Sequence, residues 1–261
     1  MRSHWLYILF GAVMFAACGD DDSDFAVRPD GGKSVSSERL SSSSAGPTTL
    51  ATRCKTQLHD DCEYGTLTDE RDGRTYKTVK IGNQWWMAEN LNFATEESAC
   101  TEGSYVDVLG QGQYYTWADA IDSVALSAKG IACGDSILCN LTSLVRGICP
   151  EGWHLPSMDD FNTLIESAGE GFDLMTTTGW QYMGMASNDG TDALGFSAYP
   201  AGYTSSSCGS PLSLGYSVLF WSSWDESDTH AGGLILQMAM ENANYIGTEK
   251  NKRNKVRCVK D

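Results

Sequence analysis

The sequence predicts an α+β domain with a mainly antiparallel β-sheet, one or two helices and several disulfides. One clear amphipathic helix lies near the middle of the chain, and short β-rich segments follow it. The chain also has nine cysteines among its 261 residues. Short strands with few helices are typical of α+β folds with an antiparallel sheet.

The predicted helix begins after Pro156. Ser157 is a good N-cap, and Asp159 and Asp160 lie in the first turn, where the helix dipole favours negative charge. Apolar residues then recur at helical spacing until Gly169 ends the helix. They are Phe161, Leu164, Ile165 and Ala168.

The remaining elements are predicted to be short. Residues 75–81 and 84–87 form a hairpin around Gly82-Asn83, and Thr116 caps a helix over residues 117–121. Four β-like segments complete the domain, at residues 217–224, 232–240, 242–248 and 255–259.

The N-terminus indicates export. Residues 1–17 combine a basic start with a short apolar run that ends in Ala16-Ala17, as in a secretory signal peptide. Small residues directly before Cys18 resemble a bacterial lipobox, although Phe15 stands where an aliphatic residue is usual. We therefore expect Cys18 to be lipidated, with several acyl chains giving a stable anchor. An ordinary signal peptide with an incidental Cys18 is the alternative.

Residues 18–65 are predicted to be a disordered tether, and residues 66–261 the folded domain. The tether begins with the acidic run 19–24 and is rich in serine, so it has too little apolar surface to offset chain entropy. The acidic run resembles a tag for the outer face of the outer membrane, with a solvated linker as the alternative. Cys54 and Cys62 are close enough in sequence to close a small loop.

Charge excludes several partners. The formal net charge is −16, from 34 acidic and 18 basic residues. This balance argues against nucleic acid and against docking on anionic lipid by charge. We expect membrane contact only through the N-terminal lipid.

The cysteines are predicted to form disulfides. Setting Cys18 aside leaves eight, an even number in an oxidising compartment. The chain has no CxxC pair and only four histidines, which disfavours zinc.

Six blocks of the sequence, taken in order, resemble one family. They include Cys149-Pro-Glu-Gly-Trp-His-Leu-Pro-Ser157, with residues 72–92, 114–120, 195–203, 220–223 and 256–261. Together they resemble the Fibrobacter succinogenes major paralogous domain over residues 66–261. That family occurs in bacterial surface and secreted lipoproteins and has no assigned reaction.

Two of these blocks, the Cys149-Pro-Glu-Gly-Trp153 start and residues 220–223, also resemble the C-type-lectin-like fold. That resemblance implies that the helix packs on the sheet and that Cys149 pairs with Cys258. A scheme in which Cys149 pairs with Cys133 or Cys139, and Cys258 with Cys208, also uses every thiol and stays open.

No catalytic, cofactor or metal site is predicted. Cys149 and His154 are the only nearby nucleophile–base pair, and both are better explained as structural residues. Residues 188–192 and 225–228 offer oxygen ligands for calcium. The calcium motifs of sugar-binding C-type lectins are missing from the sequence, so solvated loops are the preferred interpretation.

We expect a non-catalytic, surface-exposed module that binds polysaccharide or another envelope protein. Trp180 and Trp224 lie near predicted loops, where exposed rings can stack on sugars, and Asp225 lies beside Trp224. These three residues are the candidate ligand contacts. The alternatives are a structural envelope protein without a ligand and, third, an enzyme of lectin-like fold.

Replacing Cys18 by serine is expected to abolish lipid attachment and to move the protein out of the membrane fraction. Incorporation of radiolabelled palmitate measures this directly, with label in the wild type and none in the variant. Equal labelling of both proteins would contradict the predicted lipid site.

Overall fold

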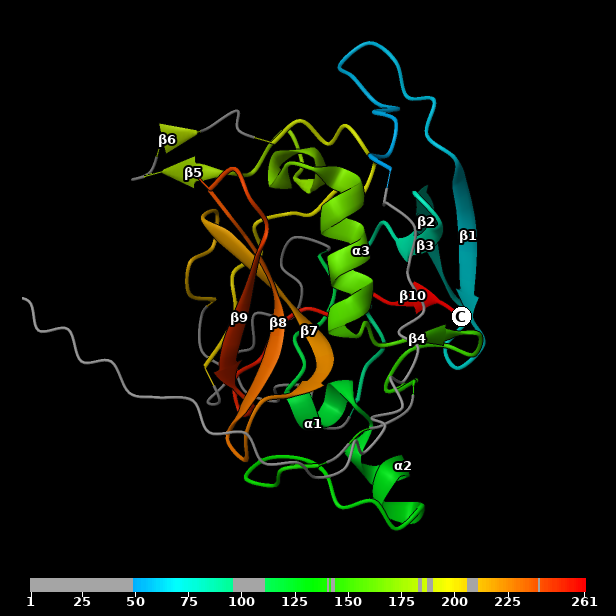
Figure 1. Cartoon of the computed structure of the whole chain (residues 1–261), viewed down its shortest axis with the longest axis vertical. Coiled ribbons are helices and arrows are strands. Elements are labelled where there is room, and N and C mark those ends of the chain that lie inside the picture. The colour runs from blue at the N-terminus through cyan, green and yellow to red at the C-terminus, as the bar shows by residue number, and fades with distance from the viewer. Residues whose placement is uncertain are drawn as a thin grey trace, which may run out of the picture. The chain divides into compact units, whose positions relative to one another are not determined.

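The computed structural model describes residues 49–95, 111–139, 141, 144–182, 185–186, 190–205, 211–238 and 240–261 (Figure 1). Ala45–Asp261 form one compact unit. The predicted signal peptide, Cys18 and residues 18–48 of the tether lie outside the described residues, as do Cys100 and Cys208. Among the residues described, no helix is both long and apolar enough to cross a membrane.

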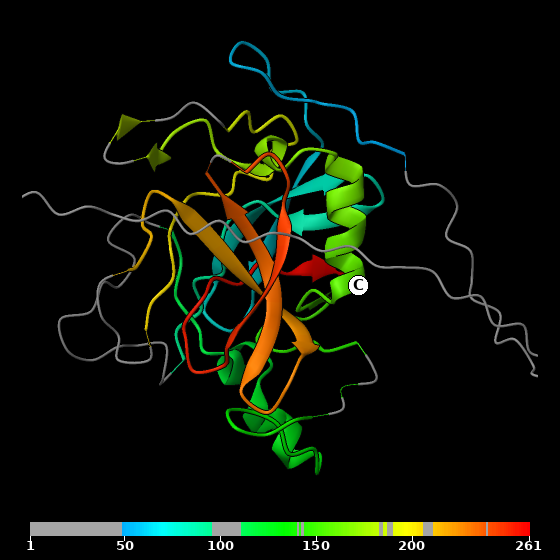
Figure 2. The same ribbon diagram turned by 60° about the vertical axis from the view of Figure 1, so that its left-hand side comes forward.

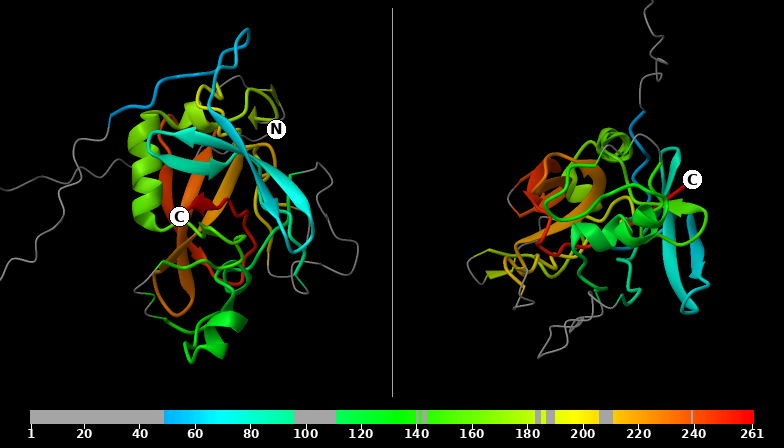
Figure 3. Two further views of the ribbon diagram at one scale, coloured as in Figure 1. Left: turned by 90° about the vertical axis from the view of Figure 1, so that its right-hand side faces the viewer. Right: turned by 90° about the horizontal axis from the view of Figure 1, so that it is seen from below.

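The first sheet contains the predicted hairpin. Its strands are β1 (Tyr64–Asp69), β2 (Arg74–Ile81), β3 (Gln84–Met87), β4 (Trp153–His154) and β10 (Val259–Lys260), in the order β1-β2-β3-β10-β4. All neighbouring pairs are antiparallel. Ile81 pairs with Gln84 across Gly82-Asn83, which confirms the hairpin. The β1–β2 hairpin forms one edge of the sheet (Figure 3).

The second sheet contains three of the four predicted β-segments. They are β7 (Ser217–Asp225), β8 (His230–Gln237) and β9 (Asn244–Glu249), paired antiparallel in that order. The predicted strand at 255–259 is wrong in extent, because only Val259 of that segment joins a sheet. Lys255 instead makes an isolated bridge to Phe220. A two-stranded hairpin joins β5 (Gln181–Tyr182) and β6 (Met185–Ala186).

Both predicted helices are present and capped as expected. In α1 (Trp117–Ala120) and α3 (Met158–Ala168), Thr116 and Ser157 each form a capping box with the aspartate three residues later. Gly169 is the C-cap of α3. The helix α2 (Ser123–Ala128) and the 3-10 helix η1 (Gly171–Leu174) were not predicted.

The main core lies where α3 meets both sheets (Figures 1 and 2). The helix contacts β2 of the first sheet and β7 and β8 of the second. Trp86 of β3 stacks on Phe161 of α3, with 5.6 Å between ring centroids. Phe196 packs edge-on against Trp86 and Phe220, and so joins the two sheets.

The folded part begins earlier than predicted. Residues 49–63, here called the N-terminal strap, belong to this compact unit, so the ordered part extends beyond the predicted boundary between tether and domain at residue 65. The backbone N–H of Ala51 donates to Ser167 (2.8 Å), and that of Cys54 to Ala193 (2.8 Å). Arg53 forms an ion pair with the buried Asp173 (2.6 Å). The short, polar sequence of the strap gives no sign of these contacts, because their partners lie far along the chain.

Three disulfides are described: Cys54–Cys62, Cys133–Cys139 and Cys149–Cys258. The Cα atoms of Cys149 and Cys258 lie 5.9 Å apart, inside the range that a disulfide requires. The predicted bridge is confirmed, and the local scheme is wrong because Cys133 and Cys139 pair with each other. The bridge ties the C-terminal strand to the segment that enters β4 and α3.

Replacing Cys149 and Cys258 together by alanine is expected to lower the free energy of unfolding by roughly 4–5 kcal/mol. Their bridge joins residues 109 positions apart, and a long loop constrains the unfolded chain most. The matched control removes Cys54–Cys62, which joins residues 8 positions apart, and the same relation gives roughly 2–3 kcal/mol. Urea unfolding followed by tryptophan fluorescence measures both losses. Equal losses for the two disulfides would contradict the expected dependence on loop length.

Candidate functional site

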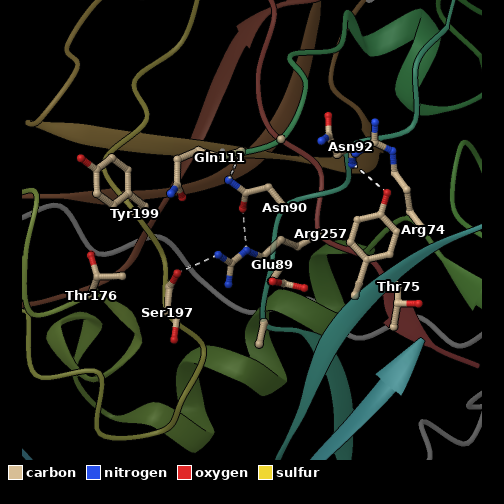
Figure 4. A pocket seen from close by; sticks show the side chains of 13 residues that line it. Arg74, Thr75, Glu89, Asn90, Asn92, Gln111, Thr176, Ser197, Tyr199 and Arg257 are labelled. Atoms are coloured by element: carbon tan, nitrogen blue, oxygen red, sulfur yellow. Dashed lines mark hydrogen bonds between the residues drawn. The ribbon is translucent and has the colours of Figure 1, made fainter. Parts of the chain in front are cut away.

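A cleft of about 410 Å³ is the candidate site (Figure 4). Five separate segments line it, at residues 74–76, 88–92, 111–112, 197–199 and 257, with Thr176 at one side. All the lining residues except Ala88 and Gly112 have a polar group in the side chain. Most pockets for small ligands are mainly apolar, so this lining favours a ligand that is itself polar.

Arg257 lies beneath the cleft and is 1% exposed. Its guanidinium donates to Asn90 Oδ1 (2.8 Å) and to the backbone oxygens of Phe196 and Ser197. The rings of Phe196 and Phe220 lie 4.4 and 5.2 Å from its Cζ. Burial lowers the pKa of Arg257 to about 9, with Asp192 and Glu89 partly offsetting that effect. The group is therefore still a cation at neutral pH.

Internal hydrogen bonds orient the rest of the lining. Asn90 donates from Nδ2 to the backbone oxygen of Gln111 (2.7 Å), while its Oδ1 accepts from Arg257. Ser197 donates from its backbone N and its Oγ to Asp192 (2.7 and 2.8 Å). These side chains are held before any ligand arrives.

Exposed polar side chains surround these fixed residues. The carboxylate of Glu89 accepts from the backbone N–H of Lys77 (2.6 Å), and Glu89 is exposed. The Arg74 side chain is 53% exposed. The half-buried ring of Tyr199 lies against Gly179, where an added Cβ would come within 2.4 Å of it. The cleft thus offers a cation, a carboxylate and an aromatic ring together.

The lining includes no histidine and no cysteine. The hydroxyl of Ser197 donates to Asp192 (2.8 Å), but that carboxylate also accepts from the backbone N–H of Ser197 and pairs with Lys55. A serine nucleophile needs an adjacent base that is available to remove its proton, and Asp192 is engaged by these other groups. Among the described residues, the cleft is arranged for hydrogen bonding.

The geometry of His154 indicates a structural role. It is 4% exposed, with Nδ1 2.8 Å from Asp261 Oδ1 and Nε2 3.3 Å from Asp160 Oδ2. Burial disfavours the imidazolium, but the hydrogen bonds to Asp160 and Asp261 outweigh it, so the pKa of His154 is raised. Since Cys149 is in a disulfide, these two residues form no nucleophile–base pair.

The three predicted ligand contacts do not lie together in the cleft. Trp180 is 1% exposed, so its expected exposure is wrong; its indole N–H donates to Thr176 Oγ1 (3.2 Å) and its ring belongs to the core. Trp224 is 42% exposed, and its ring covers Gly232 of β8. The carboxylate of Asp225 is buried, where it pairs with Lys250 (2.7 Å) and accepts from the backbone N–H of Cys139.

The predicted loops with oxygen ligands are occupied in other ways. Asp192 pairs with Lys55 of the strap and accepts from Ser197, and Asp225 is held as above. Residues 188 and 189 lie outside the described residues. In the described ranges, no group of three or more His, Cys, Asp or Glu side chains is placed to hold a metal ion.

Sequence reasoning missed the cleft residues themselves. A signal was present at Arg257, a charged residue between the apolar Val256 and Cys258 in a β-like segment. A charge at such a position is seldom buried unless it has a partner. Glu89, Asn90 and Tyr199 gave no comparable signal.

Together these features define a disulfide-stapled α+β domain with a polar cleft. The Fibrobacter succinogenes major domain matches residues 79–260, which is more than half of the chain, and the chain belongs to this family. The resemblance expected from the sequence is confirmed. Neither a curated protein nor a solved structure matches the chain, so the C-type-lectin-like part of the predicted fold stays a prediction.

Replacing His154 by glutamine is expected to cost most stability below about pH 6.5, and less as the pH rises through the raised folded-state pKa. A folded-state pKa above the unfolded value of 6.5 gives a contribution that is complete below 6.5 and lost at higher pH. Burial disfavours the Asp160 carboxylate, but hydrogen bonds from His154 and Ser157 lower its pKa below 3.8, so its contribution is lost only in acid.

Urea unfolding of wild type and variant between about pH 5 and pH 9 tests this dependence. Asp261→Asn keeps an acceptor for Nδ1 but removes its charge, so it should reproduce part of the change. A stability difference that grows with pH would contradict the expected ion pairs of a protonated His154 with Asp160 and Asp261.

Proposed function

We propose that the protein is an exported, lipid-anchored bacterial surface protein that binds polysaccharide without catalysing a reaction. The single observation that carries the proposal is the polar lining of the cleft. Each residue of a polysaccharide carries several hydroxyls besides its ring and glycosidic oxygens, so the chain needs many hydrogen-bond partners. Arg74, Glu89 and Tyr199 at the cleft supply donors, acceptors and a ring face.

Pre-organisation supports this function. Asn90, Ser197 and Arg257 are fixed by hydrogen bonds to each other, to the Asp192 carboxylate or to the backbone, so binding costs little ordering of the protein. The lining also includes no histidine or cysteine, and the hydroxyl of Ser197 is held by Asp192. Binding therefore explains the site better than catalysis does.

The proposed location rests on the sequence and on the disulfides. The lipobox-like Cys18 would anchor the chain, and the acidic run after it would direct it to the outer face of the outer membrane. Three disulfides suit an oxidising compartment outside the cytoplasm. Polysaccharide would then meet the domain directly at the cell surface.

Replacing Glu89 or Tyr199 by alanine is expected to weaken binding to polysaccharide. Each change removes one hydrogen-bonding group or ring from the cleft, and a cost of about 1–3 kcal/mol weakens affinity roughly 5- to 150-fold. Depletion of the protein from solution by insoluble cellulose, xylan or mannan measures the affinity.

The matched control is Trp224→Ala, which removes an exposed ring outside the cleft. It should leave retention unchanged. Loss of retention in Trp224→Ala alone would place the site at the loop predicted from sequence instead. No retention of the wild type on any polysaccharide would contradict the proposed ligand and favour a protein partner.

A further inference from the structure

A second cavity, of about 300 Å³, lies on the outward face of the β7–β8–β9 sheet. Strands β7 and β8 turn Val218, Phe220, Leu234 and Leu236 into the main core, so the alternate side chains face outward. Leu219 and Ile235 are directly opposite each other, and Ile246 of β9 is opposite Gly233. These three aliphatic side chains form the floor of the cavity, here called the sheet groove. Figure 2 shows its strands at the front of the unit.

Two tyrosines flank the sheet groove. Tyr203 is held beside β7 by backbone hydrogen bonds with Leu212 in both directions (3.1 and 2.7 Å), while Gly202 donates to Ser217 (2.7 Å). The hydroxyl of Tyr216 accepts from Gln237 Nε2 (2.9 Å). Both tyrosine rings are half-buried. Fixed rings lose little conformational freedom when a ligand packs on them.

Polar side chains form the rim of the sheet groove. Glu249 and Lys252 pair with each other at 3.6 Å, so their charges balance, and Gln237 adds an amide. The Nζ of Lys252 lies 5.8 Å from the centroid of Tyr203. The groove thus has an apolar floor and aromatic walls, and the carboxylate and the amine of its rim cancel in charge. These features favour a neutral ligand that is apolar on its faces and polar at its edge.

We propose that the sheet groove is a second binding site, for a neutral pyranose sugar ring. The axial C–H groups of such a ring pack on tyrosine and aliphatic surfaces, and its equatorial hydroxyls reach the amide and carboxylate of the rim. The ligand class rests on the proposed function, whereas the site rests on different residues.

The two sites share one segment of chain but no lining residue. Tyr199 faces the cleft and Tyr203 faces the sheet groove, four residues later. A polymer offers many rings at once, so two weak sites on one domain raise retention well above that of either alone. Removal of either site should thus weaken binding to a polymer more than binding to a short oligosaccharide.

Methyl NMR tests the sheet groove directly. The chain from Ala45 onward, which forms one compact unit, is labelled at isoleucine methyl groups and titrated with soluble hexasaccharides of β-1,4-linked glucose, mannose or xylose. Ile235 and Ile246 report on the groove, and the core residue Ile81 is the internal control. We expect shifts at Ile235 and Ile246 in the wild type and in the cleft variant Glu89→Ala.

Tyr203→Ala and, separately, Gln237→Ala are each expected to raise the hexasaccharide concentration that gives half of the full shift by about tenfold. Two variants guard against a folding defect in either one. Binding without shifts at Ile235 and Ile246 would overturn the sheet groove and leave the cleft intact. Shifts in the groove, together with unchanged retention of Glu89→Ala and Tyr199→Ala on insoluble polysaccharide, would support the groove and overturn the cleft. No binding of any hexasaccharide or polymer would overturn both.

Discussion

Arg257 places a positive charge between the two sheets, where only 1% of the residue is exposed. A buried charge is costly unless hydrogen bonds compensate for it. Here the compensation comes from distant parts of the chain, because Asn90 follows β3 while Phe196 and Ser197 lie about 100 residues later. Any movement that separates these segments would strip a buried cation of its acceptors. The guanidinium therefore fixes how the segments around the cleft approach each other.

The segment around Arg257 joins the sheets in a second way. Lys255 donates its backbone N–H to Leu219 and accepts from Trp221 (3.0 Å each), both in β7. Four residues later Val259 lies between β3 and β4, and Cys258 is bonded to Cys149. A few residues thus contact one sheet, cross the core and enter the other. The lining of the cleft is attached to the same segment, so this crossing also holds the lining in place.

Local chemistry predicted the elements well, and it failed where contacts are long-range. Ser157 and Asp160 indicated α3, and Gly82-Asn83 indicated the hairpin. Strand β1 was missed because only Leu67 and Asp69 of it are buried, so its pattern resembles a loop. Trp180 was misplaced because a tryptophan beside Gly179 gives no sign that its ring will join the main core. The cleft had no local pattern at all, since its lining comes from segments far apart in sequence.

The N-terminal strap determines how the domain would respond to a pull on its leading end. A force applied through the residues before Thr49 first meets the Ala51–Ser167 hydrogen bond and the Arg53–Asp173 ion pair. It then crosses directly from Cys54 to Cys62 through the covalent bond, bypassing the residues between them. The Lys55–Asp192 ion pair lies in that bypassed loop, so the pull reaches β1 without passing along the backbone of Lys55.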